Sequence, residues 1–187
     1  LSGAKVLMVA RRLQKLKVAA RKIINEGGDV DYISADVSKI NSPKKIIQKC
    51  INKWGTVNIL VNNTGGPKPI NILKSNEKNW NYAIQNNMLS VVRFAKQVIP
   101  IMKKSNWGRI VTITSTIAKE PTPGMILSAT SRAGLTAFSK AIAIEFAENN
   151  ITSNIISPGG VMTERFKNLV KIAANKEKKT YAKKISE

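Results

Sequence analysis

The sequence has no histidine, a single cysteine and few acidic residues. Because Cys50 has no second cysteine to pair with, the chain cannot form an internal disulfide, which is typical of a reducing compartment such as the cytoplasm. No apolar run approaches the roughly 18 residues that suggest a membrane-spanning helix. These absences predict a soluble, cytoplasmic protein without a membrane segment, and no residue pattern indicates a metal site.

Acidic residues are too few to balance the basic ones. The chain has 31 Lys and Arg residues against 11 Asp and Glu residues, which gives a formal net charge of +20. Such a charge permits binding to phosphate-rich partners. The basic residues are spread along the whole chain, however, and aromatic residues do not alternate with them as they do on surfaces that stack bases. We therefore interpret the lysines as solvated helix faces and do not expect nucleic-acid binding.

The first residues also lack two common features of a chain start. Residues 1–5 include neither an initiator Met nor the charged, apolar and small-residue segments of a signal peptide. We expect the sequence to be the middle of a longer chain. With 187 residues, 43% of them hydrophobic, residues 1–187 are expected to form a single, partial dinucleotide-binding domain.

Short apolar segments alternate with longer segments of helical periodicity. This alternation predicts an α/β fold, a doubly wound parallel sheet with helices on both faces. Ser42-Pro43 opens one helix, and longer helices are expected over about residues 80–103 and 128–148. The expected packed side of the last helix comprises Ala133, Phe138, Ala141 and Ile144. The five expected strands lie at residues 4–9, 30–34, 57–63, 109–114 and 152–157.

Small, polar or glycine-rich residues follow every expected strand. In an open parallel sheet, the ligand lies beyond the carboxyl ends of the strands. Backbone exposed at glycine can approach a dinucleotide closely, while hydroxyl and amide groups can bond its ribose and nicotinamide. The strand ends are Ala10-Arg11, Ala35-Asp36-Val37, residues 62–66, Thr114-Ser115 and Ser157-Pro158-Gly159. Any one could be an ordinary turn, but five in series favour a dinucleotide site.

Three motifs resemble the short-chain dehydrogenase/reductase family in residue type and order. Residues 59–65, Ile-Leu-Val-Asn-Asn-Thr-Gly, resemble the family's Leu-Val-Asn-Asn-Ala-Gly strand end. Residues 108–111, leading to Ser115, resemble its catalytic-serine strand. Residues 157–159, followed by Thr163, resemble the loop that clamps the nicotinamide. The resemblance implies a Rossmann-like oxidoreductase acting on a small carbonyl or alcohol substrate, and a homo-oligomer at full length.

Two parts of the family pattern are missing from the sequence. The family's first strand and its glycine-rich turn should lie before Leu1, and its last strand after Glu187. Because the first strand is central in the family's sheet, the resemblance predicts a gap between the strands at Val6 and Val57. It also predicts that the isolated chain is poorly stable.

The family's catalytic pair is replaced. Counting thirteen residues on from Ser115, and then four more, the positions of the family's Tyr and Lys hold Ser128 and Arg132. A Ser hydroxyl is shorter and far less acidic than a phenol, so Ser128 is a poor general acid. Arg132 stays cationic and can bond ribose hydroxyls, but it cannot shuttle protons. Asn87 matches the Asn of the family's proton relay, and these four residues are the catalytic candidates.

Two interpretations of the replaced pair stay open. The first is an oxidoreductase with an atypical active site that uses water or the substrate's own group as proton source. The second is a non-catalytic nucleotide-binding protein of the same fold.

The end of the first strand indicates the cofactor. Ala10 stands where NAD-preferring relatives have an acid, and Arg11 and Arg12 follow it. A guanidinium can pair with a 2′-phosphate, so NADP is expected, although a solvated basic helix start is the alternative explanation. The resemblance further implies that Asp36 and Val37 contact the adenine. The other cofactor contacts that it implies are Asn62, Gly65, Pro158, Gly159 and Thr163.

Overall fold

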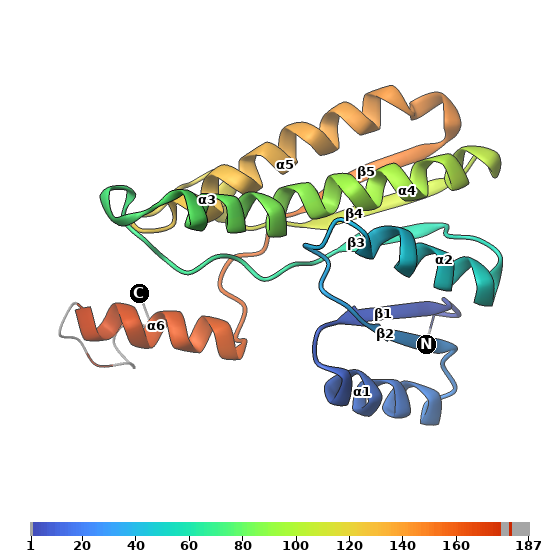
Figure 1. The fold of residues 1–187 in the computed structure, drawn as a ribbon, viewed down its shortest axis with the longest axis horizontal. Helices are drawn as coiled ribbons and strands as arrows, with labels where there is room; N and C mark the ends of the chain where they lie inside the picture. The colour runs from blue at the N-terminus through green and yellow to red at the C-terminus, as the bar shows by residue number, and fades with distance from the viewer. Residues whose placement is uncertain (1, 177–179, 181–187) are drawn as a thin grey trace. The chain divides into compact units, whose positions relative to one another are not determined.

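The structure, a computed structural model, describes residues 2–176 and 180 (Figure 1). The chain divides into two compact units, Leu1–Ser157 and Pro158–Glu187. All of the expected strands lie in the first unit, whereas the second contains the helix α6 (Glu164–Lys176).

The first unit begins with a β-α-β segment. It consists of β1 (Val6–Ala10), α1 (Leu13–Asn25) and β2 (Val30–Ser34), and the two strands pair in parallel. Glycine is required where α1 ends. Gly27 has a φ of +81°, and a Cβ at Gly28 would lie 2.5 Å from the Ile23 side chain. Their N–H groups donate to the carbonyls of Ile24 and Ile23, which turns the chain sharply into β2.

A second parallel sheet has the order β3-β4-β5. Its strands are β3 (Ile59–Asn62), β4 (Gly108–Ile113) and β5 (Ile151–Ile156). The predicted strand positions and the parallel pairing are confirmed. α2 (Ser42–Trp54) precedes β3 and begins at the predicted residue.

The helix expected over residues 80–103 is interrupted. It consists of α3 (Glu77–Ala83), a π-helical segment η2 (Ile84–Leu89) and α4 (Ser90–Lys104). The Asn76 side chain accepts from the N–H of Asn79, and the Asn79 side chain accepts from the N–H of Asn76, so a capping box fixes the start of α3. The remaining elements are η1 (Ile72–Lys74), η3 (Thr116–Ala118), α5 (Ile126–Glu145) and η4 (Ala147–Asn149).

The hydrophobic core joins the helices to the three-stranded sheet. α4 contacts β3 and β4, and α5 contacts β5. Val98 and Met102 of α4 are fully buried beside Ile110 and Ile151, which are 2% and 1% exposed. Burying these large side chains provides the main favourable free energy of folding.

The prediction for the packed side of α5 is wrong for three of its four residues, whereas the fourth, Phe138, is partly buried against the core. Ala133 and Ala141 are exposed, and Ile144 is 67% exposed. Small and hydroxyl-bearing residues face inward instead, because their hydroxyls find partners there. Ser131 Oγ donates to the Leu127 carbonyl at 2.8 Å, and Ser139 Oγ lies 2.7 Å from Ser153 Oγ of β5. The buried residues of α5 are Leu127, Ser128, Ala129, Ser131, Arg132, Leu135, Ser139 and Ile142.

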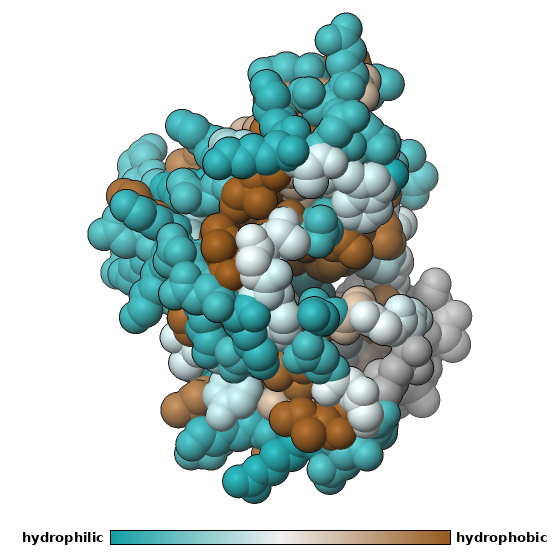
Figure 2. Space-filling model, turned by 90° about the vertical axis from the view of Figure 1, so that its right-hand side faces the viewer, coloured by the Kyte–Doolittle hydropathy of each residue, from teal (hydrophilic) through white to brown (hydrophobic). Residues whose placement is uncertain are grey.

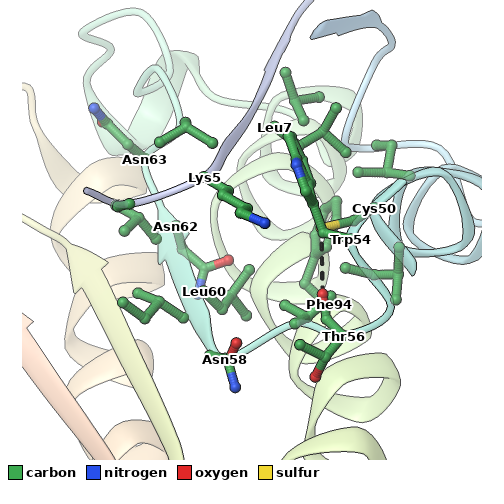
Figure 3. A pocket seen from close by; sticks show the side chains of 18 of the residues that line it. Lys5, Leu7, Cys50, Trp54, Thr56, Asn58, Leu60, Asn62, Asn63 and Phe94 are labelled. Carbon is green, nitrogen blue, oxygen red and sulfur yellow. Dashed lines mark hydrogen bonds between the residues drawn. The ribbon is translucent and has the colours of Figure 1, made fainter. Parts of the chain in front are cut away.

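A cavity separates the two sheets. Within the described residues, β1 pairs with β2 alone and β3 with β4 alone, so the edges of β1 and β3 stay unpaired. A cavity of about 820 Å³ lies between these strands and is lined by both, together with α2 and α4 (Figure 3). Ile59 and Val61 remain 52% and 59% exposed. The predicted gap between the strands at Val6 and Val57 is confirmed.

Candidate active site

The carboxyl ends of β3 and β4 lie side by side. Asn62 is in register with Thr112, and Asn62 Nδ2 donates to Thr112 Oγ1 at 3.3 Å. Both residues are buried. The segments that follow them, 63–66 and 114–115, therefore leave the sheet next to each other, as expected for parallel strands.

Arg132 of α5 bridges these two strand ends. Its Nη1 donates to the Ile113 carbonyl at 3.1 Å and its Nη2 to the Thr64 carbonyl at 3.5 Å. Its Nε donates to Ser128 Oγ at 3.2 Å. Arg132 and Ser128 are 8% and 5% exposed, so this cation is bound within the fold and is not a solvated surface charge.

Asn87 reaches the same place from the π-helical segment. It is 1% exposed, and its Nδ2 donates to Thr64 Oγ1 at 3.0 Å and to the Gly65 carbonyl at 3.1 Å. Its Oδ1 has no hydrogen-bond partner within the described part of the chain. A buried carbonyl oxygen without a donor costs about 1–3 kcal/mol, and π-helical segments often mark functional sites. Asn87 therefore presents an acceptor suited to a bound hydroxyl or water.

Ser115 follows β4 in an extended backbone conformation. Its Oγ accepts from the N–H of Ile117 at 3.4 Å and begins the short helix η3, which packs against α5. The preceding Thr114 is buried, with its Oγ1 2.9 Å from Ser157 Oγ. The structure thus brings Ser115 to the part of the molecule that also holds Ser128 and Arg132.

Glycine at position 65 is not explained by protein packing. A Cβ there would meet nothing within 4 Å, whereas the Gly65 carbonyl accepts from Asn86 Nδ2 at 2.8 Å as well as from Asn87. The backbone is thereby held in place while its outer side stays open. This arrangement fits the close approach of a ligand.

The candidate adenine-side residues lie at the ends of β1 and β2. Arg11 and Arg12 are exposed, and Ser34 Oγ donates to the Arg11 carbonyl at 3.0 Å. The hydroxyl and then the N–H of Ser38 donate to Asp36 Oδ1 and hold its pKa below the ordinary value of 3.8. The charge of Arg11 lowers this pKa further, so Asp36 is ionised and its loop is fixed.

The remaining candidates lie in the second unit, apart from Val37, which lines the cavity. Thr163 Oγ1 accepts from the N–H of Phe166 at 3.2 Å and so begins α6. A Cβ at Gly159 would meet nothing within 4 Å. That Pro158, Gly159 and Thr163 join the site formed in the first unit stays a prediction.

Two residues that organise the site were not among the predicted site residues, although Thr64 lies within the strand end at residues 62–66. Thr64 supplies both a hydroxyl and a carbonyl acceptor, and Arg93 Nη1 donates to the Ser38 carbonyl at 3.0 Å. Arg93 also bonds Gln85 of the π-helical segment. Ser38 lies 55 residues and Gln85 eight residues from Arg93, beyond the i,i+3 and i,i+4 pairs of a helix, so no local pattern could have marked it.

Metal binding and thiol chemistry find little support among the described residues. Among them, no group of three or more His, Cys, Asp or Glu side chains is placed to hold a metal ion. Burial raises the pKa of the Cys50 thiol, which makes it a weak nucleophile. In the part of the chain that the structure describes, no helix has the length and apolarity to cross a membrane.

The sequence matches known proteins over most of its length. The family model described as "short chain dehydrogenase" matches residues 1–173. The 3-oxoacyl-[acyl-carrier-protein] reductase FabG of Chlamydia muridarum is 32% identical over 168 residues, which cover 89% of this chain and 68% of that protein. The FabG protein of Escherichia coli is 34% identical over 141 residues, covering 72% and 58%.

Solved structures agree with the sequence matches. L-Sorbose reductase from Gluconobacter frateurii, complexed with NADPH and L-sorbose, has a TM-score of 0.87 at 27% identity, covering 92% of this chain and 66% of that one. A 7α-hydroxysteroid dehydrogenase complexed with NADH and 7-oxo glycochenodeoxycholic acid has a TM-score of 0.86 at 28% identity, covering 89% and 65%. The predicted Rossmann-like parallel α/β fold is confirmed, and the chain spans about two thirds of the length of most of these proteins.

Proposed function

Since this chain belongs to the short-chain dehydrogenase family, we propose that it is an NADP-dependent oxidoreductase acting on a carbonyl or alcohol carbon through an atypical active site. One observation carries the proposal: Asn87, Ser128 and Arg132 converge by hydrogen bonds on the carboxyl ends of β3 and β4, where parallel sheets bind their ligands.

Two features of the chain fit a nicotinamide dinucleotide. Asn87 Oδ1 is a buried acceptor that no described group satisfies, and Gly65 leaves its backbone open to a ligand. When bound, NADPH would supply the hydride that reduces a carbonyl carbon. Arg11 and Arg12, exposed at the end of β1, would bind its 2′-phosphate.

The relatives leave the cofactor open, because one of the matched structures contains NADPH and another contains NADH. The preference for NADP therefore rests on these two arginines.

The chain's own hydroxyls would act on the substrate oxygen. Ser115 and Ser128 can each donate a hydrogen bond to a carbonyl oxygen and stabilise the negative charge that develops there as hydride arrives at carbon. Ser128 is too weak an acid to give up its proton, so the alkoxide takes a proton from water. The carbonyl compound, NADPH and a water proton thus become the alcohol and NADP⁺.

The substrate is proposed only as a class. The matched relatives are named for 3-oxoacyl groups on acyl carrier protein, a sugar and a steroid, and all of these carry a carbonyl or alcohol carbon. We keep a small carbonyl or alcohol compound as the proposed substrate. A cytoplasmic location and a homo-oligomer stay predictions.

A non-catalytic nucleotide-binding protein is the second candidate function. The Arg132 guanidinium is directed at Ser128 and at main-chain carbonyls, which favours a structural role at this position. On this view the chain binds a nucleotide but does not reduce a substrate.

Binding and turnover measured together separate the two functions. In a version extended to the family's full length, with its first strand and glycine-rich turn, we expect NADPH to bind in calorimetry and to be oxidised with a panel of ketones and aldehydes. Replacing the altered pair by Ser128→Tyr with Arg132→Lys should raise turnover by about 10²-fold, the value of a positioned acid. Binding without turnover in either protein would favour the non-catalytic candidate, and no binding would refute both.

A further inference from the structure

We propose that Arg132 is a positioning residue: it fixes the Ser128 hydroxyl as a hydrogen-bond donor by clamping it to the ends of β3 and β4. This inference rests on the proposed function and deepens it. It differs from the expectation that Arg132 bonds the ribose of a cofactor.

The Arg132 guanidinium joins three segments of the chain by hydrogen bonds. Its Nε, Nη1 and Nη2 donate to three different segments: Ser128 Oγ at 3.2 Å, the Ile113 carbonyl at 3.1 Å and the Thr64 carbonyl at 3.5 Å. The N–H donors of an Arg side chain form a rigid planar fork, which a Lys ammonium lacks. A single planar group thereby sets the distance between the start of α5 and two strand ends.

In the hydrogen bond between Ser128 and Arg132, the Ser128 hydroxyl is the acceptor. A guanidinium has no acceptor, so Ser128 Oγ must accept from Arg132 Nε. A hydroxyl has one proton and two lone pairs, and this contact uses a lone pair. The contact with Arg132 therefore does not use the Ser128 hydroxyl proton, which can be donated to a carbonyl oxygen.

Burial and charge make this donor effective. Both residues are almost enclosed, with 5% of Ser128 and 8% of Arg132 exposed, so water screens their interaction weakly. A hydroxyl that accepts from a cation is polarised and becomes a stronger donor. Its bond to a carbonyl oxygen grows as that oxygen becomes negative, which stabilises the transition state more than the bound substrate.

The start of α5 is built for this arrangement. Positions 128 and 132 are one helical turn apart and so share a face. Ser131 Oγ donates to the Leu127 carbonyl, so the hydrogen-bond partner of this second hydroxyl lies within the helix itself. Asn87 bonds Thr64 Oγ1, and Thr64 also supplies one of the carbonyls that Arg132 binds. The clamp and the Asn87 acceptor are thus fixed to the same residue.

A double-mutant cycle on NADPH oxidation, in a version extended to the family's full length, tests the proposal. Ser128→Ala should lower kcat by about 10²-fold, the cost of one lost oxyanion donor. Arg132→Lys keeps the charge but not the fork, and should lower kcat by about tenfold or more, with the Kd for NADPH changed less than about twofold.

The effects of the two substitutions on kcat should not be additive. In the Ser128→Ala background, Arg132→Lys should lower kcat by no more than about twofold, because its effect passes through the missing hydroxyl. Lys140→Met, at an exposed basic residue of the same helix, is the matched control and should leave both constants unchanged. Additive losses in kcat, or a large rise in the NADPH Kd with Arg132→Lys, would overturn the proposal.

A measurement that needs no turnover keeps the proposal testable if the proposed function fails. In ¹⁵N-labelled protein, the Arg132 Nε–H should exchange with water much more slowly than that of the exposed Arg21. It should also shift and exchange faster in Ser128→Ala. If both arginines exchange at the same rate, the clamp does not exist, whatever the activity of the chain.

Discussion

Single residues of the site differ in whether their side chains face a ligand or hold the protein together. Arg11 and Arg12 are exposed, whereas Arg132 and Asn87 are buried and bonded to neighbouring strand ends. Sequence position alone cannot separate these roles. A basic residue can bind a phosphate, lie in solvent or clamp a backbone, and its hydrogen-bond partners decide which.

Arg11 and Arg12 should set the cofactor preference. Replacing both by Ala should weaken NADPH binding by about tenfold, or 1.4 kcal/mol, and leave NADH binding nearly unchanged, because only NADPH has the 2′-phosphate. Calorimetry at low salt, on a version extended to the family's full length, measures both affinities. Arg21→Ala on the exposed side of α1 is the control, and equal losses for NADPH and NADH would contradict the assignment.

Asp36 should make stability depend on acid pH. The Ser38 hydrogen bonds lower its pKa in the folded chain below the value of 3.8, so the unfolded chain binds the proton first. Its contribution is present above pH 3.8 and is lost as the pH falls through the lower, folded pKa.

Urea unfolding between about pH 5 and pH 3 tests this dependence. The unfolding midpoint of the parent chain should fall more steeply over this range than that of Asp36→Asn. Parallel curves would show that Asp36 contributes nothing to the acid dependence.

At the scale of elements, periodicity predicted where the strands and helices lie, but not which side of α5 faces inward. Apolar spacing selected Ala133 and Ile144, yet Ser131 and Ser139 are buried because their hydroxyls have partners inside the fold. A hydropathy pattern treats a hydroxyl as polar whether or not it finds an acceptor. The π-helical segment was also missed, and its contacts with α5 are not visible in a local pattern.

Two neighbouring isoleucines of α5 test its orientation. Ile142→Ala should cost about 2–5 kcal/mol of unfolding free energy, because Ile142 is 5% exposed and its loss leaves a cavity. Ile144→Ala should change it by no more than about 0.5 kcal/mol, because Ile144 is 67% exposed. Denaturant unfolding measures both, and equal costs would refute the observed burial.

At the scale of the whole molecule, the main feature is the cavity between β1 and β3. Figure 2 shows hydrophobic side chains reaching the surface between hydrophilic ones around a hollowed area. The family resemblance predicted this gap, which composition and periodicity alone could not have done. Its walls include Leu7 of β1, Val61 of β3 and Phe94 of α4.

The open cavity should bind an apolar fluorescent dye such as anilinonaphthalene sulfonate under native conditions. Val61→Asp should reduce the fluorescence because it places a charge in the cavity wall. Ile144→Asp changes a similarly exposed apolar residue that does not line the cavity and serves as the control. No dye binding by the folded chain, or equal effects of both substitutions, would contradict an accessible cavity.

The proposed reaction is a hydride transfer at a site where a clamped Ser hydroxyl takes the place of the family's phenol. The most direct measurement follows deuterium from NADPH labelled at both C4 positions into the product. If hydride is transferred, the alcohol should carry one deuterium on the former carbonyl carbon, and one NADP⁺ should form per alcohol. Intact NADPH binding without any labelled alcohol, across a broad panel of ketones and aldehydes, would contradict it.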